Sequence, residues 1–308
     1  MLILASGILL LGPLLVVPLG LRLLKQAEVI SIETGYRSPA AMIWLIAVVS
    51  LACSFSQPAG TIAASLAAPW LIVTLLLALL GARHMLREVR DLDAQLALVA
   101  ALMLLAVGGG WTLISRAGLR PANFSAEIVL LTGVHFHYAG FALPILTGWT
   151  VRQLQNGTSP SRFWSSSLGT MVRRGLIASV VAGVPLVGMG ITFSPLLEVL
   201  ASGLLTLAAL LLAVMQIQVA LQPAQARRRS LLLISAVSLI CGMGLAITYA
   251  LGAYFQTKWI DIPTMIPLHG IANSVGFSLC GLLAWNLAPA APAAASFTEP
   301  AESVDDGT

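Results

Sequence analysis

Nine apolar segments follow one another along the chain, and short stretches between them collect most of the polar and charged residues. A helix needs about 20 apolar residues to cross the hydrocarbon core of a bilayer. A transmembrane barrel would instead show shorter segments of alternating hydrophobicity. The pattern therefore predicts an all-α polytopic bundle of about nine transmembrane helices. The predicted spans are 2–20, 40–57, 61–82, 93–115, 126–149, 175–193, 196–220, 231–254 and 264–287.

Composition excludes a water-soluble globular domain. Of the 308 residues, 58% are hydrophobic and only 9% are charged, whereas a soluble domain carries about a quarter charged residues. Cys53, Cys241 and Cys280 all lie in apolar runs without the paired spacing of a zinc site or a disulfide framework. The sequence therefore predicts membrane lipid as the surrounding partner, no metal site formed by the cysteines and no nucleic-acid partner.

The basic residues predict the orientation of the helices. With the N-terminus outside, thirteen Lys and Arg residues fall in cytoplasmic loops and only Arg116, Arg120 and Lys258 fall outside. Cytoplasmic loops carry such an excess of positive charge. We therefore predict an outside N-terminus and a cytoplasmic C-terminus. Tryptophans near the helix ends fit an aromatic belt at the membrane surfaces: Trp111, Trp149, Trp259 and Trp285.

The two ends of the chain differ in composition: the N-terminal segment is apolar, and the C-terminal segment is rich in Ala, Pro and acidic residues. The N-terminus lacks the basic region of a signal peptide, so residues 2–20 are interpreted as a retained helix. Residues 289–308 begin with Ala and Pro and continue with Glu and Asp, which is typical of a disordered tail. The predicted domains are therefore a transmembrane domain, 1–288, and a disordered acidic cytoplasmic tail, 289–308.

A shift of 136 residues superposes the second to fifth predicted helices on the sixth to ninth. Under this shift Trp149 falls on Trp285, and Gly108 with Thr112 falls on Gly244 with Thr248. Matched helices run in the same direction, which predicts a parallel four-plus-four repeat with the first helix added. Such repeats occur in transporters. The alternative is that apolar segments built from few residue types match by chance.

Ionisable groups are expensive inside a membrane and usually indicate function. The fifth predicted helix carries His135, His137 and Tyr138, and the ninth carries His269 and Asn273. At 1.5 Å per residue, His135 and Asn273 both lie about 14 Å below the outer end of their helices. The two helices could therefore line one cavity in the outer half of the membrane, with all five residues as ligand-binding candidates.

The spacing of these residues predicts which of them share a face. Residues two apart point about 200° away from each other on a regular helix, so His135 and His137 diverge unless the helix is distorted. His135 pairs with Tyr138 on one face, and His269 pairs with Asn273. Gly140 and Pro144 permit distortion at this point.

Three hypotheses for the histidines remain open. They could line a pathway for a substrate or a proton, since imidazole titrates near neutral pH. They could bind haem or a metal such as copper, although no Met, Cys or carboxylate cluster accompanies them. They could also simply form hydrogen bonds to neighbouring helices. The cofactor therefore stays unknown at this point.

Two acids lie at the outer ends of predicted helices. Glu127 follows Ser125, and Glu198 follows Ser194 and Pro195. A capping serine and an acid at the positive end of the helix dipole are typical helix starts. Alternatively, Glu127 or Glu198 could be the acid of an intramembrane isomerase or proton-initiated cyclase acting on a lipid or isoprenoid.

The polar strings of the fifth and ninth helices resemble those of the YndJ-like family of bacterial membrane proteins. The resemblance rests on Val-His-Phe-His-Tyr-Ala-Gly-Phe-Ala-Leu-Pro at 134–144, and on His269, Asn273, Phe277 and Trp285. It implies a polytopic protein of the bacterial inner membrane. "Transporter" is a loose label applied to some family members, and the resemblance supplies no catalytic residues. We therefore predict a membrane protein that binds or transports a small or amphiphilic molecule, or acts on a lipid substrate.

Overall fold

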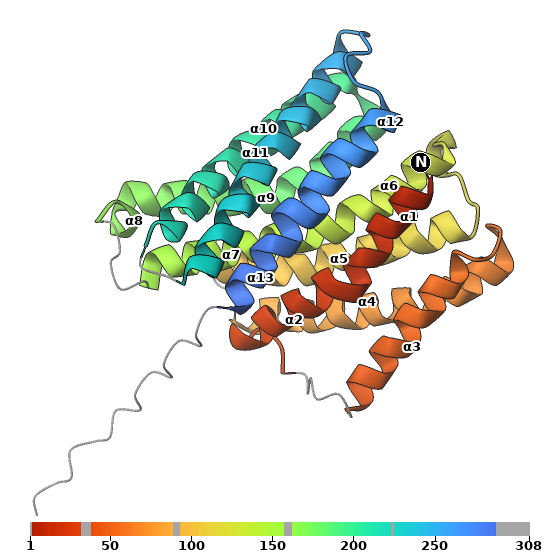
Figure 1. The fold of residues 1–308 in the computed structure, drawn as a ribbon, viewed down its shortest axis with the longest axis horizontal. Coiled ribbons are helices and arrows are strands. Elements are labelled where there is room, and N and C mark those ends of the chain that lie inside the picture. The colour runs from red at the N-terminus through yellow and green to blue at the C-terminus, as the bar shows by residue number, and fades with distance from the viewer. Residues whose placement is uncertain (1, 32–37, 89–92, 157–161, 223–224, 288–308) are drawn as a thin grey trace, which may run out of the picture.

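The computed structural model describes residues 2–31, 38–88, 93–156, 162–222 and 225–287, and every regular element in these residues is a helix (Figure 1). Eight helices, some of them built from several labelled segments, are long and apolar enough to cross a membrane. The protein is thus an all-α polytopic bundle, as the hydrophobic pattern predicts. The eight spans are Leu2–Gln26, Thr61–Arg87, Ala94–Arg116, Ala126–Gln155, Ser167–Phe193, Pro195–Ala220, Ala226–Tyr254 and Ile262–Asn286.

The predicted span 40–57 corresponds to α3 (Pro39–Ser54), which has 16 residues and is shorter than the other eight. Five helices extend five or more residues beyond their predicted starts or ends: the first span (Leu2–Gln26), α4 (Thr61–Glu88), the span Ala126–Gln155, α9 (Ser167–Phe193) and α11 (Ala226–Tyr254). The extensions carry arginines, which a hydropathy window rejects. Arginine can extend its charged group to the membrane surface from the last turn of a spanning helix, so the helix continues past the apolar run.

Three of the spans are interrupted by π-helical turns. The first consists of α1 (Leu2–Leu11), η1 (Gly12–Val16) and α2 (Val17–Gln26). The fifth, counting α3 as the second, consists of α6 (Ala126–His137), η3 (Tyr138–Ala142) and α7 (Leu143–Asn156). The last contains α12 (Ile262–Met265), η4 (Ile266–Gly270), η5 (Ala272–Leu279) and α13 (Cys280–Asn286).

Prolines accompany these interruptions, because proline lacks an N–H and clashes with the carbonyl four residues earlier. Pro13 lies in η1, Pro267 lies in η4, and Pro144 follows η3 by two residues. Gly140 lies inside η3, where the sequence predicted that distortion is permitted. The remaining elements are α5 (Ala94–Arg116), the short helices η2 (Pro121–Asn123) and α8 (Arg162–Ser165), and α10 (Pro195–Ala220).

Several features agree with the predicted repeat. Both η3 and the matching part of η5 are π-helical, and they are separated by the same shift of 136 residues. Thr112 Oγ1 donates to the Gly108 carbonyl at 2.8 Å, and Thr248 Oγ1 donates to the Gly244 carbonyl at 2.8 Å. Because threonine commonly makes this bond in membrane helices, the matched π turns are the stronger support. The duplication itself stays a prediction.

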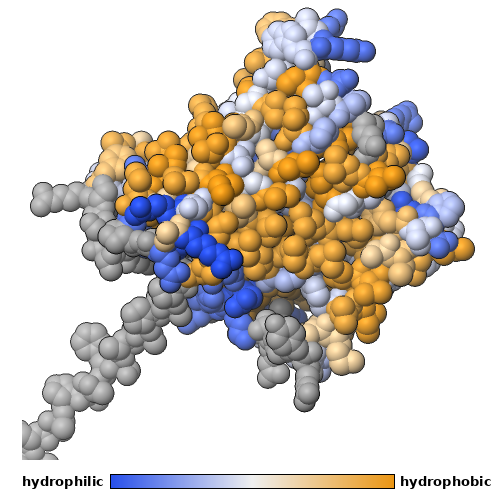
Figure 2. Space-filling model, in the orientation of Figure 1, coloured by the Kyte–Doolittle hydropathy of each residue, from blue (hydrophilic) through white to orange (hydrophobic). Residues whose placement is uncertain are grey.

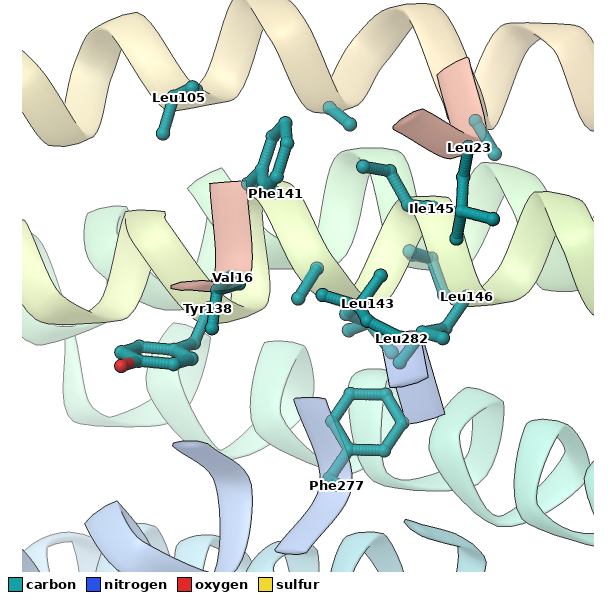
Figure 3. Close-up of a cluster of buried hydrophobic side chains, with 14 of the residues drawn as sticks. Val16, Leu23, Leu105, Tyr138, Phe141, Leu143, Ile145, Leu146, Phe277 and Leu282 are labelled. Carbon is teal, nitrogen blue, oxygen red and sulfur yellow. The ribbon is translucent and has the colours of Figure 1, made fainter. Parts of the chain in front are cut away.

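The core lies where the first span crosses the fifth and the last (Figure 3). Phe141 of η3 and Phe277 of η5, which are equivalent in the predicted repeat, both point into it and are buried. Gly20 of α2 lets the first span approach closely, because a Cβ there would lie 2.6 Å from Cε1 of Phe141. The face of the molecule drawn in Figure 2 is broadly hydrophobic, as a lipid-facing surface requires.

The tail predicted for 289–308 lies outside the described residues. The two ends of the bundle are distinguished by the helices that begin or stop there. The "Pro195 end" is where α1, α6, α10 and α12 begin, and the "Arg228 end" is the opposite one, where α11 begins and α13 stops (Figure 1).

Candidate functional site

His135 and His137 leave the fifth span in different directions, as their spacing predicts. His135 lies near α9, close to the backbone of Val184. His137 instead faces α4 and contacts Trp70. The π turn begins only at Tyr138, after both histidines, and so does not bring them to one side.

His137 is completely buried, and both of its ring nitrogens are used within the protein. Trp70 Nε1 donates to His137 Nε2 at 3.0 Å, so Nε2 is an acceptor and the proton of the neutral ring resides on Nδ1. Nδ1 then donates to the Gly133 carbonyl at 2.7 Å. Glycines enclose the ring on two sides, since a Cβ at Gly12 or Gly108 would lie 3.3 Å or 2.9 Å from it. His137 thus links its own span to three others through hydrogen bonding and close packing.

His135 has a different environment, because its Nε2 is buried and has no hydrogen-bond partner in the described chain. Its ring makes an edge contact with Phe136, with centroids 5.7 Å apart. An unpaired buried nitrogen costs about 1–3 kcal/mol. Such an atom in a native protein calls for an explanation, and a bound ligand or water is one.

His269 lies close enough to His135 for an electrostatic interaction between the two rings. Its Nδ1 donates to the Gly242 carbonyl of α11 at 2.8 Å. In the neutral ring the free lone pair is therefore on Nε2. Asn273, one turn later, donates from Nδ2 to the His269 carbonyl at 2.9 Å, so the two residues share a face as predicted.

One residue of the first span, Ile8, contacts both histidine-bearing helices beside His135 and His269. Tyr138 donates its hydroxyl to the Ile8 carbonyl at 2.7 Å, and Tyr138 is itself buried. A Cβ at Gly270 would lie 3.0 Å from the Ile8 side chain. Two helices that are far apart in sequence thus converge beside His135 and His269.

Glu127 and Glu198 lie in the first turns of α6 and α10, as predicted for helix starts. Ser125 Oγ accepts from the Ile128 amide and Ser194 Oγ accepts from the Leu197 amide, both at 3.4 Å, so both predicted caps form. Glu127 accepts a hydrogen bond from Ser125. Glu198 is only 8% exposed and interacts electrostatically with Tyr249 of α11.

Sequence reasoning missed the partners of the histidines. Trp70 lies in the middle of α4, away from the membrane-surface positions that an aromatic belt explains, and that position was the available signal. The backbone carbonyls of Val184 and Gly242 could not be predicted from the sequence, since every residue type has a backbone carbonyl. In the described ranges, no group of three or more His, Cys, Asp or Glu is placed to hold a metal ion.

Together, the fold and the buried polar contacts define a polytopic all-helical membrane protein. The chain belongs to the YndJ-like family, whose model matches residues 7–277. It is 28% identical over 191 residues to a Bacillus subtilis (strain 168) protein named "Uncharacterized membrane protein YndJ". That match covers 62% of this chain but only 32% of the relative, so the chain spans about a third of the relative's length. No solved structure matches the chain.

Proposed function

We propose that this protein binds and transports a small or amphiphilic molecule at a site formed by His135, His269 and Asn273. The observation that carries the proposal is that the helices bearing His135 and His269 both meet Ile8 of the first span, with the two rings within range of an electrostatic interaction. Each ring offers an Nε2 without a hydrogen-bond partner in the described chain. Because Nδ1 of His269 donates to the Gly242 carbonyl, its Nε2 is an acceptor, so the expected ligand presents an N–H or O–H donor to it, as an amine, amide or alcohol does.

The irregular helices beside the histidines support transport over simple binding. His269 itself lies within η4, and His135 lies three residues before η3. Single π turns in helices often mark functional sites. Binding sites in many transporters are formed by interrupted helices where two repeats meet.

The site is proposed to lie in the outer half of a bacterial inner membrane, with the N-terminus outside and the C-terminus cytoplasmic. The thirteen-to-three distribution of basic residues supports this orientation. A reporter fused after Leu287 tests it: green fluorescent protein is expected to fluoresce there, and alkaline phosphatase is expected to be inactive. Active phosphatase at this position would reverse the orientation.

The ligand site is tested by replacing His135 and His269 with glutamine. The purified protein is first screened by thermal shift against amines, polyols and amphiphilic alcohols. Compounds that stabilise the wild type are expected to bind His135→Gln and His269→Gln roughly tenfold more weakly, since each variant loses one hydrogen bond to the ligand. His84→Gln is the matched control, because His84 lies at the other end of the bundle. Unchanged binding to both site variants would contradict the proposal.

Glu198 keeps a second function open, that of an intramembrane enzyme. Its side chain is almost fully buried and lies near the Tyr249 hydroxyl. A carboxyl in such surroundings is suited to serve as a general acid towards a lipid or isoprenoid. Turnover of isoprenoid diphosphates or alcohols by the wild type, lost in Glu198→Gln, would favour this function over transport.

A further inference from the structure

The Arg228 end contains two tryptophans whose ring nitrogens are buried and unpaired. Trp285, near the end of α13, is 1% exposed, so it is not a membrane-surface residue of the kind that the sequence predicted. Its ring centroid lies 6.0 Å from that of Trp149 on α7, with the planes tilted by 38°. Neither Nε1 has a hydrogen-bond acceptor in the described chain. Buried tryptophans normally find a partner for this group.

Arg228 joins the same cluster from the first turn of α11. Its guanidinium carbon lies 4.9 Å from the Trp285 ring centroid, which is a cation–π contact. Its Nε and Nη2 are also buried and unpaired. A second arginine, Arg152, lies 5.7 Å from the Trp149 ring centroid. The cation–π contact itself supplies no hydrogen-bond acceptor to Nε or Nη2 of Arg228.

Donors exceed acceptors in this cluster. Four buried donor nitrogens are unpaired, one on Trp149, one on Trp285 and two on Arg228, against one buried unpaired acceptor, Asn286 Oδ1. The orientation of the Asn286 amide is fixed, because its Nδ2 donates to the Leu19 and Leu282 carbonyls. Each unpaired buried donor costs about 1–3 kcal/mol. A ligand that restores this balance must supply several acceptors and negative charge.

We propose that the cluster of Arg228, Trp285 and Trp149 binds a phosphate group. A phosphate offers several acceptor oxygens, and arginine binds it with two parallel hydrogen bonds. The N-terminus of α11 adds unsatisfied amides nearby, since Gln225 at the N-cap gives no side-chain cap. Hydrophilic side chains gather over this end of the molecule (Figure 2). Basic pockets between membrane helices bind lipid headgroups in this way.

The phosphate can come from an anionic lipid headgroup or from the aqueous phase, and the chemistry of recognition is the same. The site lies at the opposite end of the bundle from His135 and His269. A test of the phosphate site is therefore independent of a test of the proposed transport function.

The test measures lipid and phosphate binding to the purified full chain in detergent by thermal shift and native mass spectrometry. Dioleoylphosphatidylglycerol is compared with dioleoylglycerol, which has the same acyl chains but no phosphate, and with inorganic phosphate. Arg228→Gln is expected to weaken phosphatidylglycerol binding roughly tenfold, because it removes a charge-assisted bidentate contact. Trp285→Phe keeps an aromatic ring but removes the Nε1–H donor, and is expected to weaken phosphatidylglycerol binding roughly fivefold.

Arg227→Gln is the matched control, since Arg227 is an exposed arginine of the same turn. It removes the same charge and is expected to leave the affinity unchanged. Competition by inorganic phosphate identifies a free anion as the ligand, and failure to compete identifies the headgroup; either result supports the site. Equal affinities of the Arg228, Trp285 and Arg227 variants, or equal binding of dioleoylglycerol, overturn the proposal.

Discussion

Replacing His137 with glutamine is expected to destabilise the protein, whereas the same change at His135 is expected to leave stability nearly unchanged. His137 bonds to Trp70 and Gly133 and fills a space lined by glycines. Its loss leaves a buried donor on Trp70 unpaired, which costs about 1–3 kcal/mol. His135 Nε2 has no partner to lose, so we expect a change below about 1 kcal/mol. Thermal unfolding in detergent measures both.

A double-mutant cycle identifies the cause of the His137 effect. Trp70→Phe removes the donor and keeps an aromatic ring, so its effect should not add to that of His137→Gln. Strict additivity would show that the hydrogen bond between Trp70 and His137 contributes nothing. Equal stability of the His135 and His137 variants would remove the distinction between a structural and a ligand-binding histidine.

Replacing Gly190 with alanine is expected to destabilise the α9–α10 hairpin strongly. A Cβ at Gly190 would collide with the backbone of Leu197 and Glu198, which cannot move away as a flexible side chain can. Overpacking of this kind costs about 1–3 kcal/mol. The two helices would have to separate at the turn, and Glu198 would move with them.

Gly188, two residues earlier on α9, provides a control of opposite sign. A Cβ at Gly188 would meet nothing within 4 Å. Glycine in a helix interior is less favourable than alanine by about 1 kcal/mol. Gly188→Ala is therefore expected to raise the unfolding temperature slightly, while Gly190→Ala lowers it. A similar effect of both changes would contradict the close approach of α9 and α10.

The sequence predicted the fold well because lipid leaves few alternatives for an apolar chain. Backbone groups must bond within each segment, so apolar length alone indicates helices. The helix starts at Ser125 and Ser194 were also predictable, since capping is local. The starts of α9 and α11 were not, because Arg173 and Arg227–Arg229 lie within helices that a hydropathy window ends too early.

The candidate site was predictable to the extent that it depends on single helices. Helical periodicity separated His135 from His137 and paired His269 with Asn273, and the structure agrees. The partners across helices were not predictable. Which carbonyl or ring faces a histidine depends on how helices pack against each other, and the contact between Trp70 and His137 joins residues 67 positions apart.

The burial of Trp285 shows a related limit of sequence reasoning. A tryptophan near a helix end has the same sequence signature whether it faces lipid or packs inward. Only the packing against Trp149 and Arg228 distinguishes the two cases. The phosphate site proposed above rests on that difference.

The approach of His135 to His269 can be measured directly by solid-state NMR on protein labelled at histidine. The chain has only four histidines, so few cross-peaks between imidazole rings can arise. A through-space cross-peak between two rings is expected in the wild type in lipid bilayers. It should disappear in His135→Gln and in His269→Gln and persist in His137→Gln. Absence of the cross-peak in the wild type, or its loss only in His137→Gln, would contradict a shared site.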